Sequence, residues 1–416
     1  MNAAATFAVP ARLTQVDFLR RGALLLAILI SGGNLIIPRI PVLVAMLVLA
    51  LLAIAATRAP AARARFTLVY SLLAVVLVAI LFRAGLTELQ ATIVRYANFA
   101  GALLLLQMYL RAGQGRFVRD LVALLQPLAI IAIATVVLAA LIEPLFQQKE
   151  VQETIYHHLF YVLNFHRTLE DAAGLQRPNG PFYEPGVLQI YLNLFLYIAL
   201  YILKSMPKAV LAGVAVLVTQ STTGFAIAGG LVGLHIWRQL GRGSLNRRVA
   251  VATFAGLLAI SLSGYIIENV RSKFFGELAG SSMARQFDLL TGLNVIAANP
   301  WVGIGFDPDR YRALSGALAF QDTLLDERIT QDRGNTNGII ALVYSVGIPL
   351  SLPFLWGLFR QRMLPDRLLV GGLLFVSFLT ESIMLTPFFL IFIFSGLLLA
   401  PAAARKPAPP GQPVVL

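Results

Sequence analysis

Long apolar runs divide this chain, and short polar or Pro- and Gly-containing stretches separate the runs. An apolar run of about 20 residues lets a helix cross roughly 30 Å of hydrocarbon. The pattern predicts about twelve spans, with breaks at Ser221 to Thr223 and at Thr386 to Pro387. The spans are roughly 21–38, 41–57, 66–82, 91–110, 120–142, 187–203, 208–220, 223–238, 249–267, 338–358, 368–384 and 386–400. The sequence therefore predicts an all-α, polytopic integral membrane protein that forms a single membrane domain over 1–416.

Composition supports this prediction and excludes several function classes. Of the 416 residues, 58% are hydrophobic and 13% charged, which is more apolar surface than a soluble domain of this size can bury. The absence of Cys excludes disulfides, thiolate metal sites and cysteine nucleophiles. Only four His are present, which argues against a zinc enzyme. No metal or cofactor is expected.

The basic residues follow the predicted topology rather than a nucleic-acid surface. Twenty of the 33 Lys and Arg residues lie in alternate loops or at the termini, whereas the intervening short loops hold only Arg39 and Arg83. Cytoplasmic loops are enriched in positive charge, so both termini are expected in the cytoplasm. The two long segments 143–186 and 268–337, which carry 15 of the 20 acidic residues, then lie outside it. We expect short helices in both loops and a disordered cytoplasmic tail over 401–416.

The first candidate site is the stretch "QRPNGPFYEPG", which enters the span that starts near 187. Its Pro and Gly residues fix a turn beside Arg177 and Glu184. Two interpretations are open. The two charges pair and cap the helix, or the guanidinium of Arg177 binds an anion such as phosphate through its bidentate fork.

The second candidate lies in the stretch from Ser281 to Tyr311. Apolar spacing predicts a helix over 283–298 on the outer surface, with Arg285 in its first turn, followed by the breaking sequence "NPWVGIG". Arg285 could also be an ordinary solvated residue. The "DPD" of Asp307 to Asp309 is similar to the metal-binding pair of nucleotide-sugar enzymes. Those substrates are cytoplasmic and this loop is predicted to be external, so a turn is favoured.

The third candidate is "DRGNTNGII", which contains Arg333, Thr336 and Asn337 at the start of a late span. Capping of the helix alone could explain these residues. Inside the spans, Arg95 and Glu381 lie near predicted outer ends, so both are expected to snorkel toward the membrane surface.

Taken in order, these stretches resemble the O-antigen ligase and O-antigen or exopolysaccharide polymerase superfamily of bacterial envelopes. The resemblance covers roughly 170–400 and rests on "RPNGPFYEPG", "QSTTGFAIAGG", "RQFDLLTGLNVIAANPWVGIG" and "NTNGIIALVYSVGI". It implies a metal-independent glycosyltransferase in the bacterial inner membrane, with a periplasmic active site. The implied donor is an undecaprenyl-diphosphate-linked glycan, the acceptor is a second glycan, and a chain-length regulator is a possible protein partner. No nucleic-acid partner is expected.

The resemblance also implies residue roles. Arg177 and Arg285 match the arginines that hold the diphosphate, while Tyr183, Arg333, Thr336 and Asn337 would position the substrate. Ligases carry a His beside the late-helix Asn, proposed as the base, and here Thr336 stands in that place. Threonine is no general base at neutral pH.

The resemblance thus favours a polymerase, with Glu184 as the base or acceptor-orienting carboxylate, over a ligase that transfers to lipid A core. A flippase for lipid-linked glycans is the alternative of another class. It would favour charges near the bilayer midplane and internal repeats.

Overall fold

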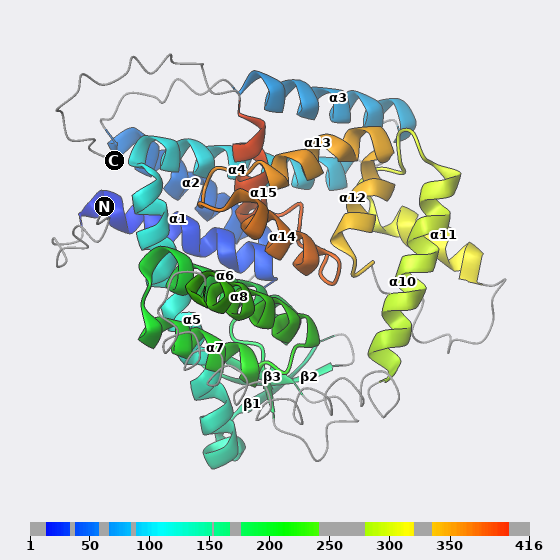
Figure 1. The fold of residues 1–416 in the computed structure, drawn as a ribbon. Helices are drawn as coiled ribbons and strands as arrows, with labels where there is room; N and C mark the ends of the chain where they lie inside the picture. Colours follow the sequence, from blue (N-terminus) through cyan, green and yellow to red (C-terminus); the bar gives the residue numbers. More distant parts are fainter. Residues whose placement is uncertain are drawn as a thin grey trace, which may run out of the picture.

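The structure is a computed structural model that describes residues 14–33, 38–57, 66–84, 89–151, 154–166, 176–240, 279–319 and 335–398. These residues are mostly helical, with one small sheet (Figure 1). The elements are α1 (Gln15–Gly32), α2 (Arg39–Ala56), α3 (Thr67–Ala84), α4 (Leu89–Ala112), α5 (Gln114–Ile142), η1 (Glu143–Leu145), β1 (Gln147–Val151), β2 (Thr154–Leu159), β3 (Leu163–His166), β4 (Arg177–Pro178), α6 (Pro185–Tyr197), η2 (Ile198–Leu203), α7 (Met206–Val218), α8 (Thr222–Leu240), α10 (Ala279–Ala298), α11 (Pro308–Ala319), α12 (Gly338–Val346), α13 (Ile348–Phe359), α14 (Arg367–Phe378) and α15 (Pro387–Leu397).

Four helices within the described ranges are long and apolar enough to cross a membrane. They are α2, α4, α5 with its η1 extension, and α6 with its π-helical extension η2. Large apolar side chains also stand exposed on outer helices: Val78 and Phe82 of α3 are 67% and 89% exposed, and Leu141 of α5 is 72% exposed. Such surface suits acyl chains rather than water. The protein is therefore a membrane-embedded helical protein, while the count of twelve spans stays a prediction.

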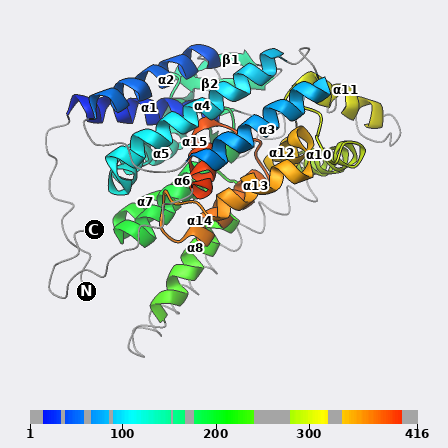
Figure 2. The same ribbon diagram turned by 90° about the horizontal axis from the view of Figure 1, so that it is seen from above.

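Among the described helices α6 and α15 are the most deeply buried, and both consist mainly of apolar residues. Every residue of α15 is buried, and so is every residue of α6 except Gly186. Helix α15 packs against α1, α4 and α13, and α6 packs against α5, α7 and α8. Both views place α15 in the middle of the molecule, with α10, α11 and α12 together at one end (Figures 1 and 2).

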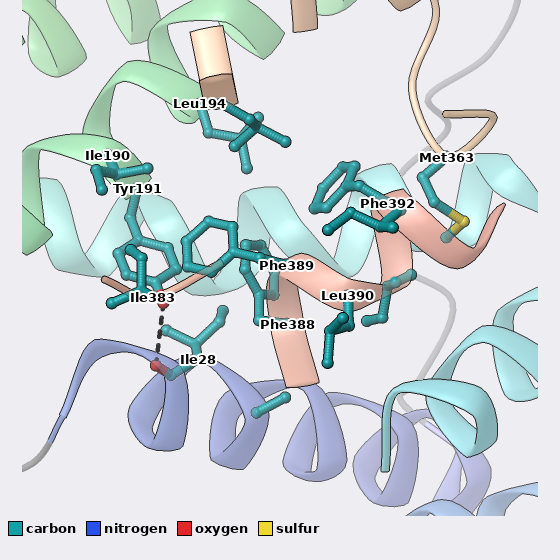
Figure 3. Close-up of a cluster of buried hydrophobic side chains, with 14 of the residues drawn as sticks. Ile28, Ile190, Tyr191, Leu194, Met363, Ile383, Phe388, Phe389, Leu390 and Phe392 are labelled. Carbon is teal, nitrogen blue, oxygen red and sulfur yellow. Dashed lines mark hydrogen bonds between the residues drawn. The ribbon is translucent and has the colours of Figure 1, made fainter. Parts of the chain in front are cut away.

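Aromatic side chains join α1, α6 and α15 in the core (Figure 3). The ring of Tyr191 packs against Phe388 and Phe389, with centroid distances of 5.3 and 5.6 Å. The Tyr191 hydroxyl donates a hydrogen bond to the Ile28 carbonyl at 3.2 Å. A buried tyrosine needs such a partner, so this contact fixes α6 against α1.

The first long loop differs from expectation, because the described part of 143–186 forms a four-stranded antiparallel sheet in place of short α-helices. Its strands follow the chain order β1-β2-β3-β4. A tight turn joins β2 to β3, and its residues Phe160 and Tyr161 both have positive φ. Polar and apolar residues alternate in β3, and this two-residue period is typical of a strand with two unlike faces. In β2 the adjacent residues His157 and His158 interrupt the alternation.

The predicted span 338–358 is two helices, α12 and α13, which break at Gly347. Gly347 has φ +81°, and a side chain there would collide with the Trp301 carbonyl. The sequence "NPWVGIG" ends α10 as predicted and lies against this break, with Ile304 N donating to the Tyr344 carbonyl at 2.7 Å. The motif thus joins α10 to the α12–α13 junction.

Other sequence expectations have mixed outcomes. The helix predicted over 283–298 is confirmed as α10, and the breaks near 221 and 386 are confirmed by the starts of α8 and α15. Asp307 accepts a hydrogen bond from Asp309 N at 3.0 Å where α11 begins, which agrees with the turn interpretation. The predicted span 249–267, Arg333 and the tail lie outside the described residues.

A buried charge network ties the start of α1 to the start of α5. Asp120 is fully buried and accepts hydrogen bonds from Arg20 Nε at 2.5 Å, Arg21 Nε at 2.9 Å and the Tyr109 hydroxyl at 3.3 Å. Arg20 also bonds Asp17 at 2.7 Å. We call these five residues the Asp120 network.

Candidate active site at the start of helix α6

The segment before α6 folds back onto the end of α1. The rings of Phe182 and Tyr183 lie directly over Gly32 and Gly33, where any side chain would collide with them. Asn179 is fully buried and holds the turn by donating to the Tyr183 carbonyl at 3.1 Å. The Pro and Gly residues of "RPNGPFYEPG" therefore form a fixed turn, as the sequence predicted.

Glu184 is the N-cap residue of α6, in an extended conformation with φ −141°. Its side chain makes no capping hydrogen bond, so capping does not explain a carboxylate at this position. It lies close enough to Tyr156 of β2 to interact electrostatically. Burial, together with the negative charge of Glu184, raises the pKa of Tyr156 to about 12. Tyr156 therefore stays a hydroxyl donor at neutral pH.

Glu381 meets Glu184 at Gly186, a contact that the sequence did not indicate. A Cβ on Gly186 would collide with Glu381 Oε1 and lie 3.8 Å from Glu184 Oε2. Glu381 is only 3% exposed and lies in the turn between α14 and α15, so the expectation that it snorkels is wrong. A carboxylate removed from water in this way needs a polar partner.

Helix α12 begins against the same turn. A Cβ on Gly338 would lie 2.7 Å from the Glu381 carbonyl oxygen, so only glycine allows this approach. Asn337 caps α12, and its side-chain oxygen accepts from Ile339 N and Ile340 N, both at 3.0 Å. The capping interpretation of Asn337 is thus confirmed, and the start of α12 lies beside Glu381.

Thr336 is held by a residue that sequence reasoning missed. Its hydroxyl donates to Asp288 Oδ2 at 2.6 Å, and its backbone N donates to the same oxygen at 3.0 Å. Asp288 lies on α10 and is buried. Asn335 adds a bond from its side-chain amide to the Asp288 carbonyl at 2.7 Å. These contacts anchor α10 to the start of α12, and only the three-dimensional contact reveals them.

The two predicted diphosphate arginines lie on elements with different neighbours. Arg177 is half-buried in β4, which packs on β3 and α5, and its Nε donates to the Thr219 carbonyl at 3.3 Å. Arg285 is exposed on α10, which packs on α11 and α12. Their meeting at one diphosphate stays a prediction.

A different pair of arginines, Arg39 and Arg95, lies within electrostatic range of each other. Arg39 is the first residue of α2 and Arg95 lies in the second turn of α4, and these two helices pack together. The Arg95 guanidinium lies 5.2 Å from the Phe306 ring centroid and donates to the Leu385 carbonyl at 3.3 Å, so Arg95 turns into the protein instead of snorkelling. Within the described ranges neither arginine forms an ion pair.

Comparisons with protein-family models, with curated proteins and with solved structures found no match. The part of the chain that the structure describes also holds no cluster of three or more His, Asp or Glu side chains suited to a metal ion.

Proposed function

We propose that this protein is a membrane glycosyltransferase that polymerises undecaprenyl-diphosphate-linked oligosaccharide units at the periplasmic face of the bacterial inner membrane. One observation carries the proposal. Glu184, Glu381 and the start of α12 converge where α6 begins, in a protein whose described part holds four helices long and apolar enough to cross a membrane, as a lipid-linked substrate requires. Arg39 begins α2, and Arg95 lies in the second turn of the neighbouring helix α4.

The proposed reaction is one direct displacement. The acceptor hydroxyl attacks the anomeric carbon of the donor sugar as the bond between that carbon and the diphosphate oxygen breaks. Glu184 takes the hydroxyl proton, and undecaprenyl diphosphate leaves. Attack from the face opposite the leaving group inverts that carbon. Glu184 suits the role because its carboxylate is not used as a helix cap.

Arginines supply the charge that the leaving diphosphate needs. Guanidiniums hold phosphate oxygens through paired hydrogen bonds and stabilise developing charge without a metal. Arg177 and Arg285 retain this proposed role. Arg39 and Arg95 are added because two like charges that lie close together favour an anion between them. Helix starts add partial positive charge, and α2, α6 and α12 begin near this end.

Substrate positioning is divided among the other predicted residues. Tyr183 stands next to Glu184 and lies within electrostatic range of Arg39. Asn337 and Thr336 contribute through the fixed start of α12, because their side chains already bond Ile339 N, Ile340 N and Asp288. Arg333 is retained from the sequence alone.

The ligase and the flippase predict different products. Purified protein in nanodiscs is given lipid-linked repeat units, with lipid A core as a second acceptor. A ladder of polymer supports a polymerase, transfer to the core indicates a ligase, and unchanged glycan overturns both. Movement of the intact lipid-linked glycan across a sealed vesicle would indicate the flippase.

Variants of the proposed site residues test the mechanism in the same assay. Glu184→Gln, Arg39→Ala and the double variant Arg177→Ala, Arg285→Ala should each abolish the ladder. Arg238→Ala is the matched control, because Arg238 is a half-exposed arginine paired with Asp366 at 3.2 Å and lies outside the proposed site. A fully active double variant would exclude the arginine mechanism.

A further inference from the structure

The two faces of the small sheet differ. The face called apolar here contains an apolar cluster that packs on α5, together with His157 stacked on Phe165, and the opposite face is mostly polar. Directly opposed residues in an antiparallel sheet share a face, and residues two apart along a strand do so too. The apolar face carries Phe165 and Leu163, which pack with Phe146 and with Ala139 at the end of α5. Because this face is fixed to a helix, the position of the opposite face is fixed as well.

The polar face carries one residue from each strand in a single row. The register pairs Lys149 with Tyr156, Tyr156 with His166, and His166 with Arg177. We call these four residues the polar row. Lys149 is exposed and the other three are half-buried, so the row is partly accessible. The rings of Tyr156 and His166 lie side by side, with centroids 5.6 Å apart.

A second polar pair lies on the same face, next to the row. His158 and Asn164 are directly opposed across β2 and β3 and are 5% and 1% exposed. Within the described ranges, His158 Nδ1 and Asn164 Oδ1 have no hydrogen-bond partner. A buried polar atom without a partner is costly, so these two atoms point to a ligand that both donates and accepts. A sugar hydroxyl does both.

The polar row is joined to the proposed reaction centre. Tyr156 lies within electrostatic range of Glu184. His166 Nδ1 lies 3.1 Å from the Asn179 side-chain oxygen, and Asn179 also holds the Tyr183 carbonyl just before Glu184. A glycan bound along the polar row would therefore extend to Glu184, the carboxylate proposed to take the proton of the acceptor hydroxyl.

We infer that the polar face of the sheet binds a sugar ring of the glycan, with Tyr156 and His166 against the ring and Lys149 bonding its polar groups, while Arg177 at the end of the row keeps its proposed role at the diphosphate. This inference rests on the proposed function and adds a glycan-binding surface to it. Aromatic rings suit the C–H face of a sugar, and a few placed polar groups give orientation. The two faces of the sheet thus have separate roles: one packs on α5, and the other is inferred to bind the glycan.

The test uses the full chain in nanodiscs and saturation-transfer NMR. The probe is the oligosaccharide mixture released by mild acid from the surface polysaccharide of the source cells. Each variant has a neighbour on the opposite face as its control. Tyr156→Ala is compared with Ile155→Ala, and Lys149→Ala with Gln148→Ala, since adjacent residues of a strand point to opposite faces.

The expected result is binding to the wild-type protein that weakens about threefold to tenfold in Tyr156→Ala and measurably in Lys149→Ala, while both controls bind normally. If Tyr156→Ala does not fold, the comparison of Lys149→Ala with Gln148→Ala tests the inference, because both side chains are exposed and their removal should leave folding intact. No binding to the wild type, or equal effects on the two faces, overturns the inference. Binding without polymer formation on the same sample would instead contradict the proposed function alone.

Discussion

Replacement of Asp120 by Ala should strongly destabilise the protein. The carboxylate is fully buried and is bonded by Arg20, Arg21 and Tyr109. Arg20 is only 3% exposed, so the substitution leaves a guanidinium inside the protein without its main partner. The cost therefore comes from an uncompensated buried charge rather than from a lost attraction alone.

The size of the loss in unfolding free energy depends on which interactions Arg20 and Arg21 keep once Asp120 is removed. Removing one partner of a buried ion pair costs about 3–5 kcal/mol. Arg20 keeps Asp17 at 2.7 Å, and the Arg21 side chain is 32% exposed and can be hydrated. Both features reduce the loss, so we expect a decrease of about 3 kcal/mol in the free energy of unfolding.

Unfolding in mixed micelles with increasing SDS measures this change. The control is Asp366→Asn, which removes an ion pair with Arg238 in which both side chains are 42% exposed, and which keeps a residue type that tolerates the positive φ at this position. Exposed pairs contribute about 0–1 kcal/mol, so the control should stay near wild type. The double variant Arg20→Met, Asp120→Leu should recover most of the stability, because apolar residues replace the buried charges. Equal losses of stability in Asp120→Ala and Asp366→Asn would refute the reasoning.

Three further outcomes are expected. Gly347→Ala should lower the free energy of unfolding by about 2 kcal/mol or more, because the positive φ and the adjacent carbonyl exclude a side chain. Gly372→Ala, in open space on α14, should leave it unchanged or raise it; equal losses in thermal midpoint would contradict the argument. Asn337→Ala should cost about 1 kcal/mol and Asn337→Ser much less, as thermal unfolding can show, since both Asn and Ser cap helices. Because the pKa of Tyr156 is raised to about 12, the folded protein keeps a proton between about pH 10 and 12 that the unfolded chain releases. The free energy of unfolding should therefore be unaffected by Tyr156 below about pH 10 and should fall as pH rises from about 10 through about 12. Tyr156→Phe should lessen this alkaline loss of stability, and an unchanged pH profile of stability in the variant would count against the prediction.

The sequence predicted those features that depend on local pattern. The apolar runs place α6 and α15 within a few residues, and "NPWVGIG" and "RPNGPFYEPG" form turns because Gly and Pro restrict the backbone locally. The sheet was missed because its strands are short and polar, and their pairing joins segments that pattern alone does not connect.

The candidate site shows the same limit. Glu184 was found because it lies inside a turn signature, whereas Glu381 read as a surface charge near the end of a span. Its place beside Gly186 depends on how α14, α15 and α6 pack, and no local signal encodes that packing. The closeness of Arg39 and Arg95 has the same origin, because α2 and α4 become neighbours only in the folded bundle.

The Asp120 network has a consequence for residues far along the same two helices. It links α1 and α5 near their N-terminal ends, through residues in the second turn of each helix. The opposite end of α1 supports Phe182 and Tyr183, and the opposite end of α5 supports the sheet through Ala139. The two helices are therefore joined at one end by the Asp120 network, and at their other ends they support the turn before Glu184 and the strands of the sheet. A substitution that weakens the Asp120 network would therefore change the distance between the Glu184 turn and the sheet, although the network lies far from both.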